Sequence, residues 1–184
     1  IFSENGFHII DCDKVARQTV EPGKPALRDI AAYFSDDILG SDGTLNRKKL
    51  GAAVFSDRKK LDALNSIIYP YITYDIVAHI SSLPAEEKAF VLLDAPTLFE
   101  SGADALCDTV VSVTADRDVC LGRIMKRDGL TREQAEMRLS SQHDKDFYMQ
   151  RSEFCAENSG TASELEKALV GIVQSIRKKG DRIE

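Results

Sequence analysis

The fold of this chain is decided by two short segments, FHIID at residues 7–11 and FVLLD at residues 90–94. Each is an apolar run that ends in an aspartate, and the first follows the turn signal Asn5-Gly6. A third run, TVVSVT at residues 109–114, is rich in β-branched residues. Continuously apolar strands are typical of a parallel sheet that is covered on both faces. We therefore predict three such strands.

Helical patterns occur between and after these strands, at residues 15–20, 119–126, 132–141 and 162–178. Asp13 is well placed as the N-cap of the first of these helices. Residues 26–80 repeat apolar side chains at helical spacing, interrupted at Pro70, and show no strand pattern. The alternation of strand and helix predicts an α/β fold, in which helices flank a parallel sheet and residues 26–80 form a helical insertion.

The composition of the 184 residues excludes several classes of partner. The net charge of −6 and the pI near 5.2 argue against general nucleic-acid binding, which needs a basic face. No stretch reaches the ~18 apolar residues of a membrane span, and no signal peptide is visible. The four cysteines show no CxxC spacing, so we expect reduced thiols in a cytoplasmic protein. The sequence does not predict an oligomeric state.

Acidic residues mark the ends of the first two predicted strands. Asp11, closely followed by Asp13, ends one strand, and Asp94 ends the other. Ligands of open parallel sheets bind beyond the carboxyl ends of the strands. Carboxylates that converge there can hold Mg²⁺ through water or accept a proton from a hydroxyl group. The simpler alternative is that Asp13 caps a helix and Asp94 belongs to a turn.

Basic residues cluster further along the chain. Arg123 and Arg127 are four residues apart and so share one helix face, and further arginines follow the turn Asp128-Gly129. Arginines on two helices joined by a short turn could close on a phosphate group through paired, charge-assisted hydrogen bonds. The alternative is a solvated helical hairpin with ion pairs four residues apart, such as Arg132 with Glu136.

Taken together, the segments resemble the dephospho-CoA kinase family. The matching stretches are residues 10–17, 21–23, 64–65, 69–70, 93–100, Arg123, Arg127, residues 131–135, Arg138, Gln142 and residues 158–160. Each match is short, but their order and spacing hold over nearly the whole chain. The resemblance implies a P-loop kinase fold. It also implies transfer of the γ-phosphate of ATP to the ribose 3′-hydroxyl of dephospho-CoA, the last step of coenzyme A synthesis.

The resemblance also assigns expected roles by matched position, with ATP and Mg²⁺ as cofactors. Asp13 would be the acid that faces the acceptor hydroxyl, and Arg123 the lid arginine that meets the transferred phosphate. Nucleotide binding would involve Arg127, Asn158 and Gly160. Acceptor binding would involve Asp11, Arg17, Asp94, Pro96, Leu98, Phe99 and Glu100.

The implied domains follow the same pattern. A core domain would comprise residues 1–25 and 81–184 and would carry a lid at about 117–142. The helical insertion, residues 26–80, would bind the acceptor.

The sequence departs from the family pattern at its beginning. The glycine-rich phosphate-binding loop of the family, G-x-x-x-x-G-K-[ST], should precede Ile1. Without that loop we expect the chain as it stands to bind ATP poorly and to be inactive. We attribute this to a missing N-terminal segment of about 20 residues, the length of a strand and its loop, rather than to a pseudoenzyme. Smaller departures are Tyr69 for His, Thr97 for Leu, and Arg151-Ser152 for Ala-Asp.

Two other functions stay open. One is a kinase of the same fold with another small acceptor, such as a nucleoside monophosphate or a shikimate-like hydroxyl compound. The helical insertion and Leu98-Phe99-Glu100 favour the longer CoA-type acceptor. The other is a catalytically silent binding or scaffold protein that lacks the phosphate-binding loop.

Overall fold

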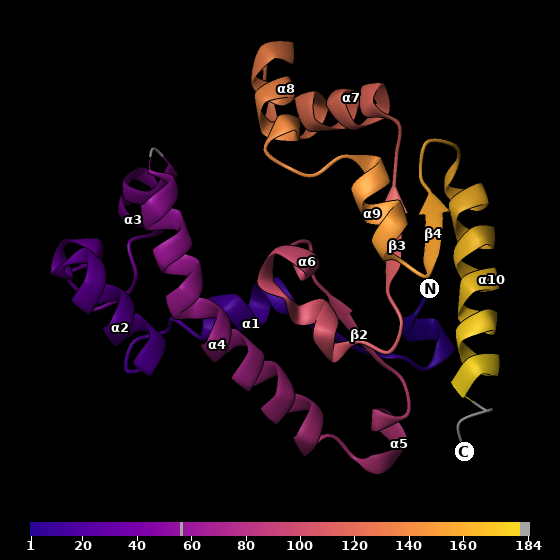
Figure 1. Cartoon of the computed structure of the whole chain (residues 1–184), viewed down its shortest axis with the longest axis horizontal. Helices are drawn as coiled ribbons and strands as arrows, with labels where there is room; N and C mark the ends of the chain where they lie inside the picture. The colour runs from indigo at the N-terminus through magenta and orange to yellow at the C-terminus, as the bar shows by residue number, and fades with distance from the viewer. Residues whose placement is uncertain (56, 181–184) are drawn as a thin grey trace. The chain divides into compact units, whose positions relative to one another are not determined.

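A computed structural model describes residues 1–55 and 57–180 of the chain (Figure 1). The chain divides into two compact units, Phe2–Ala105 and the part from Leu106 onward, which also includes Ile1. Each unit contains a pair of parallel strands with helices packed against it. The predicted α/β fold with parallel strands and flanking helices is therefore confirmed.

The sheet of the first unit joins the two segments that end in aspartate. Strand β1 (His8–Asp11) pairs in parallel with β2 (Val91–Asp94). His8 is opposite Val91 and Asp11 is opposite Asp94. This register brings the two terminal aspartates to the same edge of the sheet, as the sequence predicted.

Helices make up most of the first unit. They are η1 (Ser3–Asn5), α1 (Cys12–Gln18), α2 (Pro25–Phe34), η2 (Asp36–Ile38), α3 (Arg47–Phe55), α4 (Arg58–Ser82), α5 (Ala85–Lys88), α6 (Leu98–Ser101) and, at the junction with the second unit, η3 (Ala103–Leu106). Between β1 and β2 the described residues contain no strand, which confirms the predicted helical block. The interruption predicted at Pro70 is wrong, because α4 is continuous through it. A proline removes one backbone hydrogen bond, and packing along both halves of α4 compensates for that loss.

Helix α4 links two apolar cores. One core consists mainly of residues from α2 and α3, and its buried members are Val20, Ala26, Leu27, Ile30, Ile38, Leu50 and Val54. The amino-terminal half of α4 covers this core with Leu64, Ile67 and Ile68. The carboxyl-terminal half places Ile76, which is 1% exposed, against Ile10 of β1 and Val15 of α1. The helix thus ties the sheet edge that carries the aspartates to the helical block.

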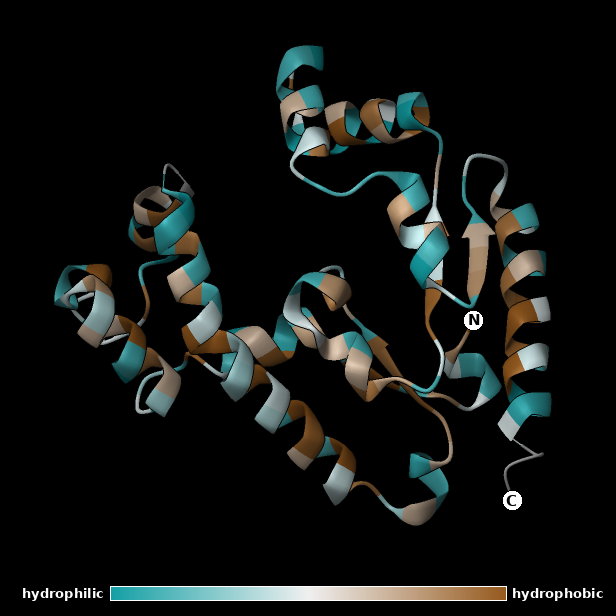
Figure 2. Ribbon diagram, in the orientation of Figure 1, coloured by the Kyte–Doolittle hydropathy of each residue, from teal (hydrophilic) through white to brown (hydrophobic). Residues whose placement is uncertain are grey.

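The second unit is built around another parallel pair. Strand β3 (Val111–Thr114) pairs with β4 (Phe154–Glu157), and Thr114 is opposite Glu157 at the carboxyl end. The helices are α7 (Arg117–Asp128), α8 (Arg132–Ser140), α9 (Lys145–Arg151) and α10 (Ala162–Gly180). The predicted helices match α7, α8 and α10, whereas β4 and α9 were not predicted. In Figure 2 the apolar residues of α10 follow one side of the helix, where Leu169, Ile172 and Val173 are buried.

The prediction that the strands are covered on both faces is wrong at two positions. Ile9 of β1 is 37% exposed and Val113 of β3 is 52% exposed. Within the described residues each sheet has only two strands. Every strand therefore has a neighbour on one side only, which leaves these side chains incompletely covered.

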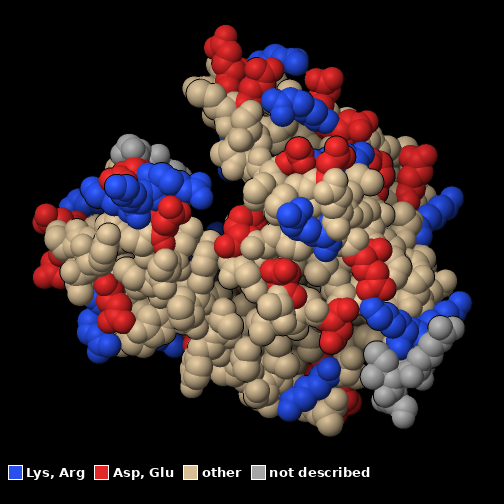
Figure 3. Space-filling model, in the orientation of Figure 1, with Lys and Arg blue, Asp and Glu red and all other residues tan. Residues whose placement is uncertain are grey.

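The surface shows no single basic face in the view of Figure 3, where acidic and basic side chains are interspersed over α7 and α8. Among the described residues, no helix is both long enough and apolar enough to cross a membrane.

Candidate active site

A cavity of about 340 Å³ opens at the carboxyl edge of the β1–β2 sheet. It is lined by Asp11, Asp13, Lys14, Arg17, Asp94 and Pro96. Five of these six residues were predicted as site residues from the sequence. Strand β1 and the start of α1 supply one side of the cavity, and the residues at the end of β2 supply the other.

The N-cap of α1 is Asp11 and not Asp13, so that prediction is wrong. The Asp11 carboxylate accepts a hydrogen bond from the backbone N–H of Lys14 at 2.9 Å. Asp11 has extended backbone angles, φ −75° and ψ 102°, and the helix begins at the next residue. Asp13 therefore lies within the first turn of α1 and is exposed. Its carboxylate makes no hydrogen bond or ion pair within the described part of the chain, so it is available to a ligand.

The same cavity also contains positive charge. Lys14 and Arg17 both come from α1 and both are exposed. Sequence reasoning assigned Arg17 but not Lys14, although Lys14 lies inside the matching stretch of residues 10–17. The sequence spacing could have indicated Lys14, because Lys14 and Arg17 are three residues apart and so share a helix face. The cavity can thus receive a hydroxyl group at a carboxylate and an anionic group at the two cations.

The other residues predicted to bind the acceptor follow β2. Pro96 lines the cavity, whereas Leu98, Phe99 and Glu100 are not among the residues that line it. Leu98 and Phe99 are half-buried on α6. Glu100 acts on Tyr69 of α4. Burial raises the pKa of the Tyr69 hydroxyl, and the negative charge of Glu100 raises it further.

In the second unit, the residue after β4 contacts the predicted catalytic arginine. The backbone N–H of Asn158 donates to the carbonyl oxygen of Thr114 at 2.7 Å and extends the strand pairing by one residue. The side-chain oxygen of Asn158 accepts a hydrogen bond from Nη2 of Arg123 at 3.4 Å. Arg123 and Asn158, which were predicted separately, are therefore brought together at the carboxyl edge of the β3–β4 sheet.

Gly160 lies close to the Glu164 side chain at the start of α10. A Cβ atom at this position would clash with the carboxylate of Glu164. That carboxylate accepts hydrogen bonds from the backbone N–H of Thr161 at 2.7 Å and from its hydroxyl at 2.8 Å. These bonds lower the pKa of Glu164, the backbone bond having the larger effect. The loop before α10 is consequently held close to the helix.

Sequence reasoning missed a charged network at this edge. Lys145 of α9 pairs with Glu157 of β4 and lies 3.7 Å from a carboxylate oxygen of Asp116. Ser159 accepts a hydrogen bond from the backbone N–H of Asp116 at 2.7 Å and donates to Glu157. Lys145 and, to a lesser extent, Ser159 lower the pKa of Glu157. The network fixes the loop that contains Asn158.

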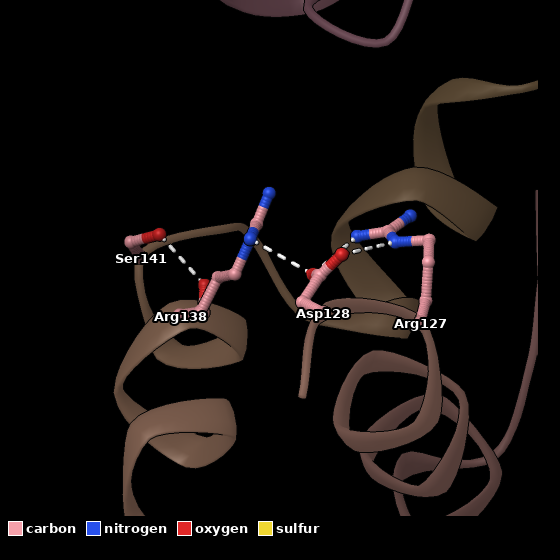
Figure 4. Close-up of polar contacts among 4 residues, drawn as sticks. All are labelled: Arg127, Asp128, Arg138 and Ser141. Carbon is pink, nitrogen blue, oxygen red and sulfur yellow. Dashed lines mark hydrogen bonds and ion pairs between the residues drawn. The ribbon is translucent and has the colours of Figure 1, made fainter. Parts of the chain in front are cut away.

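The predicted arginine hairpin is formed by α7 and α8. Arg127 donates to both carboxylate oxygens of Asp128, at 2.8 and 2.9 Å, and Arg138 donates to the same carboxylate at 2.9 Å (Figure 4). The ion pair of Arg132 with Glu136 at 3.0 Å, which was the simpler alternative, is present as well. Asp128 raises the pKa of Arg127, and Arg127 is the main cause of the lowered pKa of Asp128.

Asp13 and Arg123 belong to different compact units. The first unit carries the cavity at the β1–β2 edge, and the second carries the contact between Arg123 and Asn158 at the β3–β4 edge.

Comparisons with known proteins show the family to which the chain belongs. The family model described as dephospho-CoA kinase matches residues 1–164. The dephospho-CoA kinase of Lactobacillus johnsonii is 35% identical over 175 residues, which covers 95% of this chain and 88% of that protein. The dephospho-CoA kinase of Saccharomyces cerevisiae is 39% identical over 173 residues, covering 92% and 72% of the two chains.

Two solved structures are also similar. A Thermus thermophilus protein aligns with a TM-score of 0.77 and 28% identity, and the alignment covers 95% of this chain and 87% of that one. The dephospho-CoA kinase from Campylobacter jejuni aligns with a TM-score of 0.68 and 30% identity, with coverage of 96% and 88%.

Proposed function

This chain belongs to the dephospho-CoA kinase family, and on that premise we propose that it transfers the γ-phosphate of ATP to the ribose 3′-hydroxyl of dephospho-CoA. The observation that carries the proposal is the cavity at the β1–β2 edge, where Asp13 stands without a partner among the described residues. In the transfer, a bond forms between the acceptor oxygen and the γ-phosphorus. The bond from that phosphorus to the β,γ-bridging oxygen breaks, and ADP leaves.

Asp13 is proposed to orient the acceptor hydroxyl and to accept its proton. A carboxylate can do this when it is ionised, exposed to the ligand and not already bound. The capping bond of Asp11 satisfies the end of α1, so Asp13 is not needed for that task.

Arg123 and Arg127 are proposed to neutralise the transferred phosphate. Phosphoryl transfer depends mainly on alignment and on charge stabilisation at the equatorial oxygens. Guanidinium groups suit this task because they present paired donors that stay charged. The weak 3.4 Å contact between Arg123 and Asn158 leaves Arg123 able to exchange this partner for a phosphate.

The remaining residues are proposed to bind the two substrates. Asn158 and Gly160 would frame the nucleotide. The acceptor would meet Asp11, Arg17, Asp94, Pro96, Leu98, Phe99 and Glu100. The cavity residues among them offer both hydrogen-bond acceptors and a cation to a ribose that carries a phosphate.

Mg²⁺ is proposed to arrive with ATP. The described residues contain no cluster of three His, Cys, Asp or Glu side chains that could hold a metal ion by themselves. In such sites Mg²⁺ usually binds one or two carboxylates together with substrate phosphates and water. Asp94 is a carboxylate at the cavity that could contribute, and the ion would lower the charge repulsion between phosphate and acceptor.

The proposed domain roles follow the predicted boundaries. Residues 1–25 and 81–184 would form the core, with the lid at about 117–142, and residues 26–80 would bind the acceptor. A reaction that uses ATP and a soluble coenzyme precursor is consistent with a cytoplasmic protein.

A panel of acceptors tests the proposal directly. The full-length protein is incubated with ATP and Mg²⁺, and ADP release is followed with dephospho-CoA, a nucleoside monophosphate and shikimate in turn. We expect ADP release to depend on dephospho-CoA and to be at least 10²-fold faster with it, because a site that pairs with a substrate's polar groups discriminates strongly. Equal rates with all acceptors, or faster turnover of another one, would reject the proposed acceptor.

A further inference from the structure

Asp128 occupies the end of α7, where the chain turns back into α8. The turn is made by Gly129, which has a left-handed backbone with φ 66°. Its N–H closes the helix by donating to the carbonyl oxygen of Met125 at 3.0 Å. Because the turn is tight, the Asp128 carboxylate reaches an arginine on each helix, Arg127 before the turn and Arg138 after it.

The geometry of these contacts leaves donors unused. Arg127 gives its Nε and one N–H of Nη2 to Asp128, which is the side edge of the guanidinium group. Its end edge, Nη1 with the second N–H of Nη2, has no hydrogen-bond partner among the described residues. Arg138 uses only Nη1 for Asp128. The side chains of Arg127 and Arg138 are 67% and 56% exposed, so these donors can meet a ligand.

The charge at the turn is also unbalanced. Two guanidinium groups share one carboxylate, which leaves a net charge of about +1 on the three side chains. A second anion at this place is therefore attracted. A phosphate group fits because its oxygens can accept paired hydrogen bonds from more than one guanidinium at the same time.

We propose that Asp128 is a positioning residue that holds Arg127 and Arg138 together as one fork for a phosphate group. This inference rests on the proposed phosphoryl transfer and deepens it, since it names the residue that orders the lid arginines. Asp128 touches neither substrate. Asp128 binds Nε and Nη2 of Arg127 and Nη1 of Arg138, which restricts the rotamers of both side chains. Their remaining N–H donors can then converge on one anion.

The competing explanation makes the opposite prediction. If the carboxylate merely competes with phosphate for the two arginines, its removal frees both guanidinium groups and strengthens anion binding. If it positions them, its removal weakens binding and slows transfer. A role in stability alone would alter neither as long as the variant remains folded.

Inorganic pyrophosphate is the probe that separates these outcomes without any turnover. We titrate the full-length protein with it and follow the ¹⁵Nε–H signals of Arg127 and Arg138 by NMR. In the wild type we expect both signals to shift with one common dissociation constant. In Asp128→Asn we expect that constant to rise about tenfold, the effect of losing preorganisation at one site. Absence of a shift in the wild type, or unchanged or tighter binding in the variant, would overturn the inference.

Asp118→Asn is the matched control. Asp118 also lies on α7 and also pairs with an arginine of α8, Arg132, at 3.4 Å, and its side chain is 88% exposed. Its removal breaks an ion pair between the same two helices but leaves the fork intact. We expect the pyrophosphate dissociation constant to stay within about twofold of the wild type. An equal loss in both variants would show that the hairpin as a whole matters, and not Asp128.

Steady-state kinetics provide a second test of the role of Asp128. In protein that turns over dephospho-CoA, we expect Asp128→Asn to lower kcat about tenfold and to change KM for the acceptor by less than twofold. In an Arg127→Ala, Arg138→Ala background the same change should have no further effect, because Asp128 acts through these arginines. A full additional loss there would overturn the inference. Absence of turnover would reject the proposed function but would leave the pyrophosphate result to decide this one.

Discussion

The carboxyl edges of the two sheets differ in how their charges are used. At the β1–β2 edge, Asp13 and Arg17 line a cavity, and neither has a side-chain partner within the described residues. At the β3–β4 edge, Lys145, Glu157 and Asp116 are linked to one another and to the loop that contains Asn158. The first edge therefore has exposed charged groups without a side-chain partner, whereas the second holds the loop that contains Asn158 in place through contacts within the protein.

Substitutions at the two edges should therefore have different effects. An unpaired group acts on the substrate directly, so its loss should reduce the rate of the reaction. A paired network acts by positioning, so its loss should alter nucleotide binding and acid stability more than the chemical step. The following experiments probe that contrast, beginning with the largest expected effect.

Asp13→Asn should have the largest effect. It keeps the shape of the side chain but removes the charge that accepts the proton, and we expect kcat to fall by ~10²–10⁴. The measurement is steady-state turnover of dephospho-CoA, with Asp62→Asn as a control, since Asp62 is an exposed acid that pairs with its helical neighbour Arg58. Near-normal turnover of Asp13→Asn would remove Asp13 from the role of base.

Arg123→Ala should have the next largest effect. It removes one donor that stabilises the transition state, and we expect a loss in kcat of about 10²-fold. Lys126→Ala, an exposed cation on the same helix, is the control for a general loss of positive charge. If Arg123→Ala changes only KM for the acceptor, Arg123 anchors the substrate and does not act on the transferred phosphate.

Much of the first edge was predictable from the sequence. Strands that end in Asp11 and Asp94 were visible as apolar runs, and a parallel register necessarily places their ends together. The sequence could not decide which aspartate caps α1, because both Asp11 and Asp13 precede a helical pattern. The choice depends on the backbone angles at Asp11, which leave no loop between strand and helix.

The second edge was harder to predict. Strand β4 has the sequence FCAE, and its apolar run lies between Glu153 and Glu157. That run is shorter than those by which the other strands were found. Its partner β3 is about 40 residues away in the sequence. The pairing of Lys145 with Glu157 depends on that strand pairing and on α9. The resemblance to the family therefore indicated Asn158 and Arg123 but not the contacts that join them.

The packing of α1 provides a prediction on stability. The hydroxyl of Thr19, a residue that is 2% exposed, donates to the Asp75 carboxylate of α4 at 2.8 Å. Thr19→Val removes this donor and leaves a carboxylate without its partner, so we expect a loss of ~1–3 kcal/mol in the free energy of unfolding. Urea denaturation measures it, with the exposed Ser66→Ala expected to stay within about 0.5 kcal/mol. An unchanged unfolding midpoint for Thr19→Val would show that this bond does not hold α1 to α4.

Substitutions in the charged network at the β3–β4 edge should have the smallest effects, and these effects should depend on pH. Lys145 lowers the pKa of Glu157 below its ordinary value of 4.5. The pair therefore stabilises the fold above that pH, and the contribution is lost as pH falls through the lowered pKa and protonates the carboxylate. In Lys145→Ala we expect a smaller loss of thermal stability between pH 6 and pH 3 than in the wild type, and a rise of ~3-fold in KM for ATP.

Lys179→Ala is the matched control for this network. Lys179 pairs with Glu153 at 2.7 Å, and Glu153 directly precedes β4 at the opposite end of the strand. Lys179 likewise lowers the pKa of Glu153. The control should therefore reduce the acid dependence of stability in the same direction but leave KM for ATP unchanged. Equal effects of both variants on KM would contradict a specific role of the carboxyl edge.

The position of the new phosphate tests the central claim most directly. The full-length protein is given ATP, Mg²⁺ and dephospho-CoA, and the product is analysed by ³¹P NMR and mass spectrometry. The account predicts one new phosphomonoester on the ribose 3′-oxygen for each ADP formed, and loss of this product in Asp13→Asn. ADP without a new ester, or an ester at another oxygen, would contradict the proposed transfer to the ribose 3′-hydroxyl.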